Sequence, residues 1–159
     1  MKNKKAKTRE RVVVAVSGGF DPVHIGHVRM FKEAKELGDE LVVILNNDNW
    51  LMAKKGFVFM PEAERKEVLE GIRHIDRVVV TKHPENPKDM SVSDALLEVK
   101  PAIFANGGDR TKDNIPEVTV CEKIKCQLIF SVGKGGKVQS SSWLIEKAAQ
   151  KKAAKQKQR

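Results

Sequence analysis

The sequence of 159 residues predicts an α/β fold, in which a single doubly wound domain is built on a five-stranded parallel sheet. Two observations support this prediction. Short runs of Val, Ile and Leu, apolar at consecutive positions, alternate along the chain with segments of helical periodicity. Strands that are apolar on both sides are typical of parallel sheets whose two faces are covered by helices. The expected domain is therefore Rossmann-like.

The first half of the chain alternates between strands and helices. The run VVVAV is expected to be a buried strand, and the segment after it spaces four apolar side chains on one helical face before Gly38 ends the helix. A loop is expected after the second strand. The next helix begins at Pro61, with acidic residues in its first turn. The expected elements are strands at 12–16, 40–46 and 76–80 and helices at 28–37 and 61–72.

The second half continues the alternation. Two apolar runs, AIFAN and QLIFSV, are expected to complete the sheet. The last helix begins at a run of serines, which are favoured at helix N-termini. The expected elements are helices at 92–99, 116–124 and 140–155 and strands at 102–106 and 127–132.

The formal net charge of +9 is concentrated at the two ends of the chain. Residues 1–11 carry +5 and residues 147–159 carry +6, which leaves −2 for residues 12–146. Because the central part is not basic, nucleic acid is expected as a partner only through the ends. The predicted organisation is a basic N-terminal tail over 1–11, one domain over 12–147 and a basic C-terminal tail over 148–159.

Composition predicts a cytoplasmic protein. No apolar run approaches the roughly 20 residues that a membrane-spanning helix needs. The basic N-terminus is not followed by an apolar region of the length found in signal peptides. The two cysteines, Cys121 and Cys126, fit a reducing compartment and are expected to be ordinary packed side chains.

The stretch SGGFDPVHIGH, residues 17–27, predicts a polyphosphate site after the first strand. Gly18 and Gly19 allow a sharp turn and a close approach of phosphates to main-chain N–H groups. His24 and His27 are three residues apart, so they share a face once the next helix begins. A helix N-terminus favours anions, and imidazoles can donate hydrogen bonds to oxygens that gather charge. The competing interpretation is a plain helix entry with one histidine as cap and the other packed.

Four segments resemble the HxGH-motif nucleotidyltransferase superfamily, in particular its cytidylyltransferase-like family. GGFDPVHIGH is similar to the HxGH signature itself. ERKEVLEGIRHIDRVVV (64–80) is similar to a segment of glycerol-phosphate cytidylyltransferases and of heptose-phosphate adenylyltransferases. NGGDR (106–110) resembles a loop of the heptose-phosphate group, and VQSSSWLI (138–145) resembles the run that opens the family's last helix. The resemblance extends over residues 12–147.

The resemblance implies that an acceptor phosphate attacks the α-phosphorus of a nucleoside triphosphate and releases pyrophosphate. An ionised phosphate needs no general base, so catalysis depends on positioning and charge neutralisation. Magnesium is expected to enter with the triphosphate, with no dedicated protein ligands. Catalytic contacts are assigned to His24, His27 and Ser141. The implied nucleotide-binding residues are Ser17, Gly18, Gly19, Phe20, His24, His27, Gly107, Asp109, Ser140, Ser141 and Ser142.

Further residues are assigned to the acceptor and to the scaffold. Lys54 and Lys55, in the loop after the second strand, and Arg65 are expected to contact the acceptor phosphate. Asp21 is expected to stiffen the turn. Arg73 is expected to serve either the site or a subunit contact, since the resemblance implies a homodimer.

Three functions remain open at this stage. The first transfers a nucleoside monophosphate, with CMP favoured narrowly over AMP, to a phosphorylated polyol, sugar or amino alcohol. The second is adenylyl transfer to nicotinate or nicotinamide mononucleotide, because GGFDPVHIGH is also similar to that group's first motif. The third is a non-catalytic nucleotide-binding protein that uses its basic tails to bind RNA or anionic surfaces.

Overall fold

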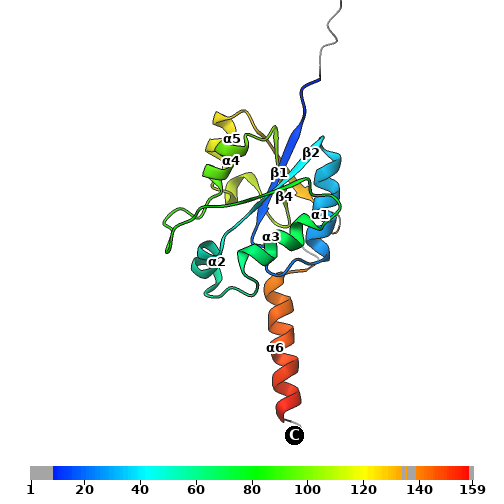
Figure 1. Cartoon of the computed structure of the whole chain (residues 1–159), viewed down its shortest axis with the longest axis vertical. Helices are drawn as coiled ribbons and strands as arrows, with labels where there is room; N and C mark the ends of the chain where they lie inside the picture. The colour runs from blue at the N-terminus through cyan, green and yellow to red at the C-terminus, as the bar shows by residue number, and fades with distance from the viewer. Residues whose placement is uncertain (1–8, 134, 136–138, 158–159) are drawn as a thin grey trace, which may run out of the picture.

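A computed structural model of the chain describes residues 9–133, 135 and 139–157. Part of each predicted tail, 1–8 and 158–159, lies outside the described residues, as do 134 and 136–138. The two ends of the described chain lie at opposite ends of the molecule (Figure 1).

Five parallel strands form one sheet, in the order β3-β2-β1-β4-β5. This confirms the predicted α/β class and the five-stranded parallel sheet. β1 continues through Ser17 and Gly18, beyond the predicted end of the strand, because both residues still pair with β2. The strands are β1 (Val13–Gly18), β2 (Glu40–Leu45), β3 (Arg77–Val80), β4 (Ile103–Gly107) and β5 (Gln127–Val132).

Apolar side chains of the sheet are buried on both faces, as the consecutive apolar runs predicted. Val14 and Val16 of β1 belong to one apolar cluster with Phe31 of α1. Ala15, which lies between them, belongs to a second cluster with Leu96 of α4. Successive residues of a strand point to opposite faces, so each face receives its own layer of helices. The helices are α1 (Ile25–Glu36), α2 (Asp48–Lys55), α3 (Glu62–Glu70), α4 (Ser93–Val99), α5 (Val118–Lys123) and α6 (Ser141–Lys157), with a 3-10 turn η1 at Lys112–Asn114.

The segment after β2 is a helix, α2, and not the loop that the sequence predicted. Asn47 caps it, since its side-chain oxygen accepts a hydrogen bond from the Trp50 backbone N–H at 3.0 Å. Gly56 ends it with a positive φ of 79°, as is common for glycine after a helix. Lys54 and Lys55 therefore lie on a helix.

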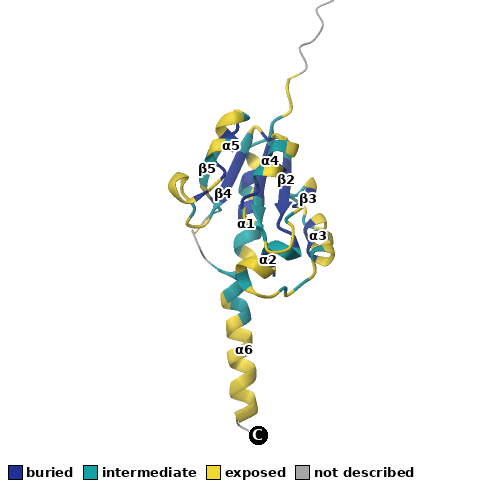
Figure 2. Cartoon of the chain, turned by 90° about the vertical axis from the view of Figure 1, so that its left-hand side faces the viewer, coloured by how far each residue is buried: buried dark blue, intermediate teal, exposed yellow. Residues whose placement is uncertain are grey.

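α6 projects from the rest of the molecule (Figure 1). Figure 2 shows most of this helix as exposed, and every residue from Glu146 to Lys157 is in the exposed class. Its first turn is the part that contacts the domain, through Ser141, which is 8% exposed. No described helix is both long and apolar enough to cross a bilayer.

The strand order places the switch point of the sheet between β1 and β4. From β1 the chain moves outward through β2 to β3, then crosses over to β4 and β5 on the other side of β1. The loops that follow β1 and β4 therefore diverge at the carboxyl ends of the strands. Ligands of doubly wound sheets bind at this point.

Candidate active site

A cavity of about 310 Å³ lies at the carboxyl ends of β1, β4 and β5. It brings together every residue that the sequence assigned to nucleotide binding. Those residues are Ser17, Gly18, Gly19, Phe20, His24, His27, Gly107, Asp109, Ser140, Ser141 and Ser142. Lys55 is the one member of the predicted acceptor set that also lines it.

The two histidines begin α1 and are fixed by the backbone of its first turn. Nδ1 of His24 accepts a hydrogen bond from the Gly26 N–H at 3.1 Å. Nδ1 of His27 accepts one from the His24 N–H at 3.3 Å. These reciprocal bonds form a capping box, and the two rings are stacked with their centroids 3.6 Å apart. His24 is thus a helix cap and a residue of the cavity at the same time.

Both rings are neutral donors near pH 7. Because each Nδ1 accepts a backbone N–H, the hydrogen bonds assign the ring proton to Nε2. Burial, followed by the charges of His24 and Lys55, lowers the pKa of His27 to about 3. Burial and then Lys55 also lower the pKa of His24. Each Nε2–H is therefore the group with which a ring can bind a phosphate oxygen.

Close packing around the cavity requires glycine at two positions. A Cβ on Gly18 would lie 2.9 Å from the ring of Phe20. That ring is 3% exposed and contacts His27 edge to face at 4.8 Å between centroids. A Cβ on Gly107 would lie 2.8 Å from the sulfur of Met30. The glycines therefore let the strand ends approach the histidine helix.

The two predicted acceptor lysines differ in position. Lys55, the last residue of α2, is half-buried and lines the cavity, whereas Lys54 is exposed and does not. Burial lowers the pKa of Lys55, the nearby Asp21 carboxylate opposes this effect, and the Arg65 charge adds to it. Lys55 is thus a cation beside the histidines.

The sequence matches the family described as cytidylyltransferase-like over residues 15–147. The chain belongs to the cytidylyltransferase-like family. An FAD synthase from Pyrococcus horikoshii is 40% identical to it over 119 residues, which cover 74% of this chain and 72% of that protein. These findings confirm the predicted superfamily, and they make the chain a nucleotidyltransferase.

Two further relatives are similar to most of the chain. Bifunctional protein HldE from Geobacter metallireducens is 35% identical over 119 residues, which cover 73% of this chain but 23% of that protein. The crystal structure of the lipopolysaccharide core biosynthesis protein from Thermoplasma volcanium superimposes with a TM-score of 0.62 at 27% identity, covering 78% of this chain and 98% of that one.

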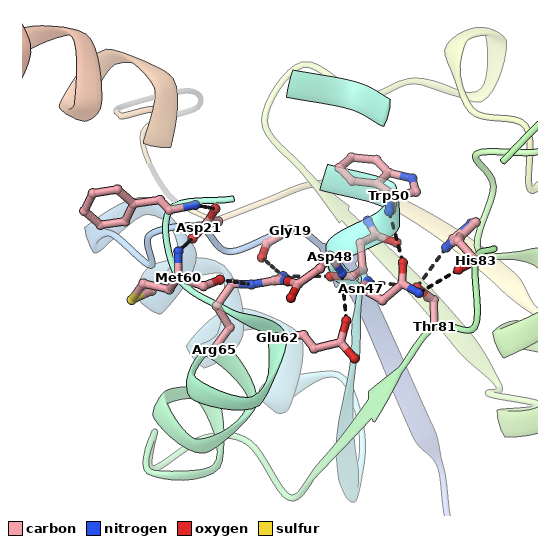
Figure 3. Close-up of polar contacts among 12 residues, drawn as sticks. Gly19, Asp21, Asn47, Asp48, Trp50, Met60, Glu62, Arg65, Thr81 and His83 are labelled. Carbon is pink, nitrogen blue, oxygen red and sulfur yellow. Dashed lines mark hydrogen bonds and ion pairs between the residues drawn. The ribbon is translucent and has the colours of Figure 1, made fainter. Parts of the chain in front are cut away.

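Arg65 of this cytidylyltransferase-like chain lies outside the cavity, in contrast to its expected role as a phosphate ligand. Its side chain is fully buried, at 0% exposure. The guanidinium donates to the carbonyls of Gly19 and Asn46, each at 2.7 Å, and to that of Met60 at 2.8 Å. It also pairs with the Asp48 carboxylate at 2.6 Å (Figure 3). Arg65 therefore joins the loops around the site, and its buried side chain does not line the cavity.

Asp21 binds a segment that begins 38 residues further along the chain. Its carboxylate is fully buried and accepts hydrogen bonds from the Phe59 and Met60 N–H groups, both at 2.7 Å (Figure 3). The aspartate thus fastens the α2–α3 connection to the turn before His24. Its structural assignment in the sequence agrees with this position, although the contact reaches beyond the turn itself.

The start of α6 is attached to the histidine loop. Ser141 Oγ donates a hydrogen bond to the Pro22 carbonyl at 2.8 Å. The Ser141 hydroxyl therefore holds the start of α6 against the histidine loop, and Ser140 and Ser142 line the cavity beside it. Arg73 lies exposed in the turn after α3 and does not line the cavity.

Several cavity residues were not predicted from the sequence. Trp50 follows β2 by five positions, so its place at the carboxyl edge of the sheet was the available signal. Met30 was expected only on the apolar face of α1. The other lining residues outside the assigned sets are Gly26, Gly108, Arg110, Val132, Gly133 and Gln139.

Proposed function

We propose that this enzyme transfers AMP from ATP to the phosphate of flavin mononucleotide (FMN), forming FAD and pyrophosphate. The 40% identity to the FAD synthase of Pyrococcus horikoshii over 119 residues carries this proposal. FAD synthases of Pyrococcus abyssi and Thermococcus kodakarensis, at 39% and 36% identity, support it. Because FAD contains an adenylyl group, the proposed donor is ATP in place of CTP.

The reaction needs positioning and charge neutralisation. An ionised oxygen of the FMN phosphate forms a bond to the α-phosphorus of ATP. The bond from that phosphorus to the bridging oxygen breaks, and pyrophosphate leaves with the electron pair. The Nε2–H groups of His24 and His27 donate hydrogen bonds to oxygens that gain charge. Lys55 neutralises the acceptor phosphate, so that two anions can approach each other.

The remaining groups of the cavity fit the triphosphate and the nucleoside. Ser140 and Ser142 offer their hydroxyls, and the first turn of α6 offers its N–H groups, to the β- and γ-phosphates. Gly107, the last residue of β4, and Asp109, which follows that strand, are proposed to contact the ribose and base. Among the described residues no three His, Cys, Asp or Glu side chains form a metal cluster. Magnesium is proposed to enter bound to the triphosphate oxygens.

The decisive experiment crosses two donors with several acceptors. The chain is incubated with magnesium and either ATP or CTP, together with FMN, a heptose phosphate, glycerol phosphate or nicotinamide mononucleotide. Products are separated by chromatography and pyrophosphate is measured in parallel. FAD from ATP and FMN is the expected product. Formation of a different dinucleotide or nucleotide sugar, with no FAD, would overturn the proposal.

Two variants test the role of the histidine loop in the same assay. His27→Ala is expected to lower FAD formation about 100- to 1,000-fold, since it removes a donor to the developing charge. His74→Ala is the matched control, because His74 does not line the cavity. Equal activity of the two variants would contradict the assignment of His27.

A phosphorylated sugar is the second candidate acceptor. The 35% identity to HldE of Geobacter metallireducens favours it, as does the resemblance of NGGDR to a loop of heptose-phosphate adenylyltransferases. Both candidates use ATP, so the acceptor arm of the experiment distinguishes them.

We also propose a homodimer, as the resemblance implies, with residues 12–147 as the catalytic unit. Light scattering at micromolar concentration measures the mass directly. A mass near the 17.8 kDa of one chain would contradict the dimer.

A further inference from the structure

The cavity has two sides, separated by the histidine loop. α2 follows β2 and contributes Trp50 and Lys55. The ends of β4 and β5, with the residues that follow them, contribute 107–110 and 132–133. Because β1 lies between β2 and β4 in the sheet, these two groups lie on opposite sides of the loop that follows β1. Two substrates can therefore approach His24 from opposite directions.

The indole of Trp50 is fixed in position. Its Nε1–H donates a hydrogen bond to the Met90 carbonyl at 2.8 Å. A ring carbon of Trp50 lies 3.7 Å from the point that a Cβ on Gly19 would occupy. Since the single polar atom of the ring is bonded, the indole has only its apolar π surface left to offer a ligand.

The helix that carries Trp50 is attached to two neighbouring segments (Figure 3). On one side the Asp48 carboxylate pairs with buried Arg65 at 2.6 Å, and the Asp48 N–H donates to Glu62 at 2.8 Å. On the other side the side-chain amide of Asn47 donates to the His83 carbonyl at 2.9 Å. An element held in this way can present a ring in one orientation.

We propose that Trp50 is the platform on which the planar ring system of the acceptor stacks, with Lys55 of the same helix binding the acceptor's phosphate. This inference rests on the proposed function and deepens it. On the α2 side of the histidine loop, the described lining residues supply one aromatic ring, that of Trp50, and one cation, Lys55. A phosphate attached to a flat heteroaromatic ring matches that pair. A polyol would instead place hydroxyl groups against an indole that has no free polar atom to bind them.

Two tryptophans and no tyrosine make the inference testable by fluorescence. Trp143→Phe leaves Trp50 as the single indole, and all further variants are made in that background. FMN is titrated into the chain, and the emission of FMN itself is recorded. Contact with an indole quenches flavin emission by electron transfer, whereas energy transfer from tryptophan to flavin acts over a longer distance and lowers only the tryptophan emission.

Trp50→Leu is expected to raise the Kd for FMN about tenfold and to leave the bound FMN fluorescent. The Kd for ATP should remain as in the parent, which also reports a folded site. Trp50→Phe keeps a ring but loses the hydrogen bond to Met90, so its Kd should lie between those of the parent and Trp50→Leu. Equal losses in both variants would overturn the inference, because the Met90 bond would then account for them.

The inference and the proposed function fail in different ways. An unchanged Kd and persistent quenching in Trp50→Leu would overturn the stacking platform, while FAD synthesis by the parent chain would stand. Binding of FMN with quenching that requires Trp50, but without FAD formation from ATP, would contradict the proposed reaction and support the platform. Failure of the parent to bind FMN would overturn both.

Discussion

His27 lies in surroundings that disfavour its charged form, and this has a consequence for stability. Its pKa in the folded chain is about 3, well below the usual value of about 6.5 that applies to the unfolded chain. As the pH falls below about 6.5, the unfolded chain takes up the proton first, so folding stability declines until about pH 3. Between about pH 7.5 and about pH 5, this residue alone should remove about 2 kcal/mol.

Urea unfolding of the parent and of His27→Gln at these two pH values measures that contribution. The parent should lose about 2 kcal/mol more than the variant on acidification, because glutamine does not titrate. His74→Gln, which changes a histidine outside the cavity and leaves His27 in place, is the matched control for the substitution itself. An identical loss in the parent and in His27→Gln would show that His27 is protonated without penalty.

Asp21 is expected to set the pH range in which Lys55 is charged. The pKa of Lys55 is lowered by burial and by Arg65 and is raised by the Asp21 carboxylate. Asp21→Asn removes the opposing charge, so the pKa of Lys55 should fall further. The alkaline decline of kcat/KM should therefore begin at a lower pH in Asp21→Asn than in the parent.

A pH–rate profile distinguishes this electrostatic effect from a loss of structure. Lys55→Arg is the control, since arginine remains charged and should abolish the alkaline decline. If kcat/KM of Asp21→Asn is lower at every pH but its alkaline decline is unshifted, Asp21 acts only through its hydrogen bonds with the Phe59 and Met60 amides.

At the scale of the elements, Arg65 connects the turn after β1, the end of β2, the start of α2 and the start of α3. Arg65→Met should lower the free energy of unfolding by about 3 to 5 kcal/mol, because it leaves the Asp48 carboxylate and three carbonyls without their donor. Arg73→Met, in an exposed turn, should change it by less than about 0.5 kcal/mol. Denaturant unfolding measures both. A higher KM for the acceptor in Arg65→Met, with an unchanged free energy of unfolding, would instead identify Arg65 as a ligand of the acceptor phosphate.

The elements predicted from sequence are those with strong local signals. β1 and β2 are continuous apolar runs, and the start of α1 follows from a glycine turn and two histidines three positions apart. α2 was missed, because an eight-residue helix carries a weak apolar period and its signals were confined to Asn47 and Gly56.

The role of Arg65 could not be predicted, for a different reason. An arginine that contacts phosphate and an arginine that binds buried carbonyls have the same local sequence. Only the fold brings Gly19, 46 residues distant, within 2.7 Å of its guanidinium. The sequence places Trp50 shortly after the second strand, but the orientation of its ring in the cavity depends on α2, the helix that was missed.

At the scale of the whole molecule, the outer part of α6 makes no contribution to the core. Every residue from Glu146 to Lys157 is exposed (Figure 2). Deletion of 148–159 removes five cations and no acid, which lowers the formal net charge from +9 to +4. FAD formation should continue, and the midpoint of thermal unfolding should shift by less than about 2 °C.

The same deletion tests what the basic helix binds. The deleted chain should bind single-stranded RNA at low salt more weakly than the full chain does. The slope of log Kd against log salt concentration should also become shallower, by nearly one unit for each phosphate that is no longer neutralised. Replacement of Lys151, Lys152 and Lys155 by glutamine is the matched control, since it keeps the helix and removes three charges. The deletion could instead lower the thermal stability while the glutamine variant stays as stable as the parent. That result would place the helix backbone and alanines in an interface between two copies of the chain. The mass of the deleted chain measured by light scattering should then fall to that of a monomer.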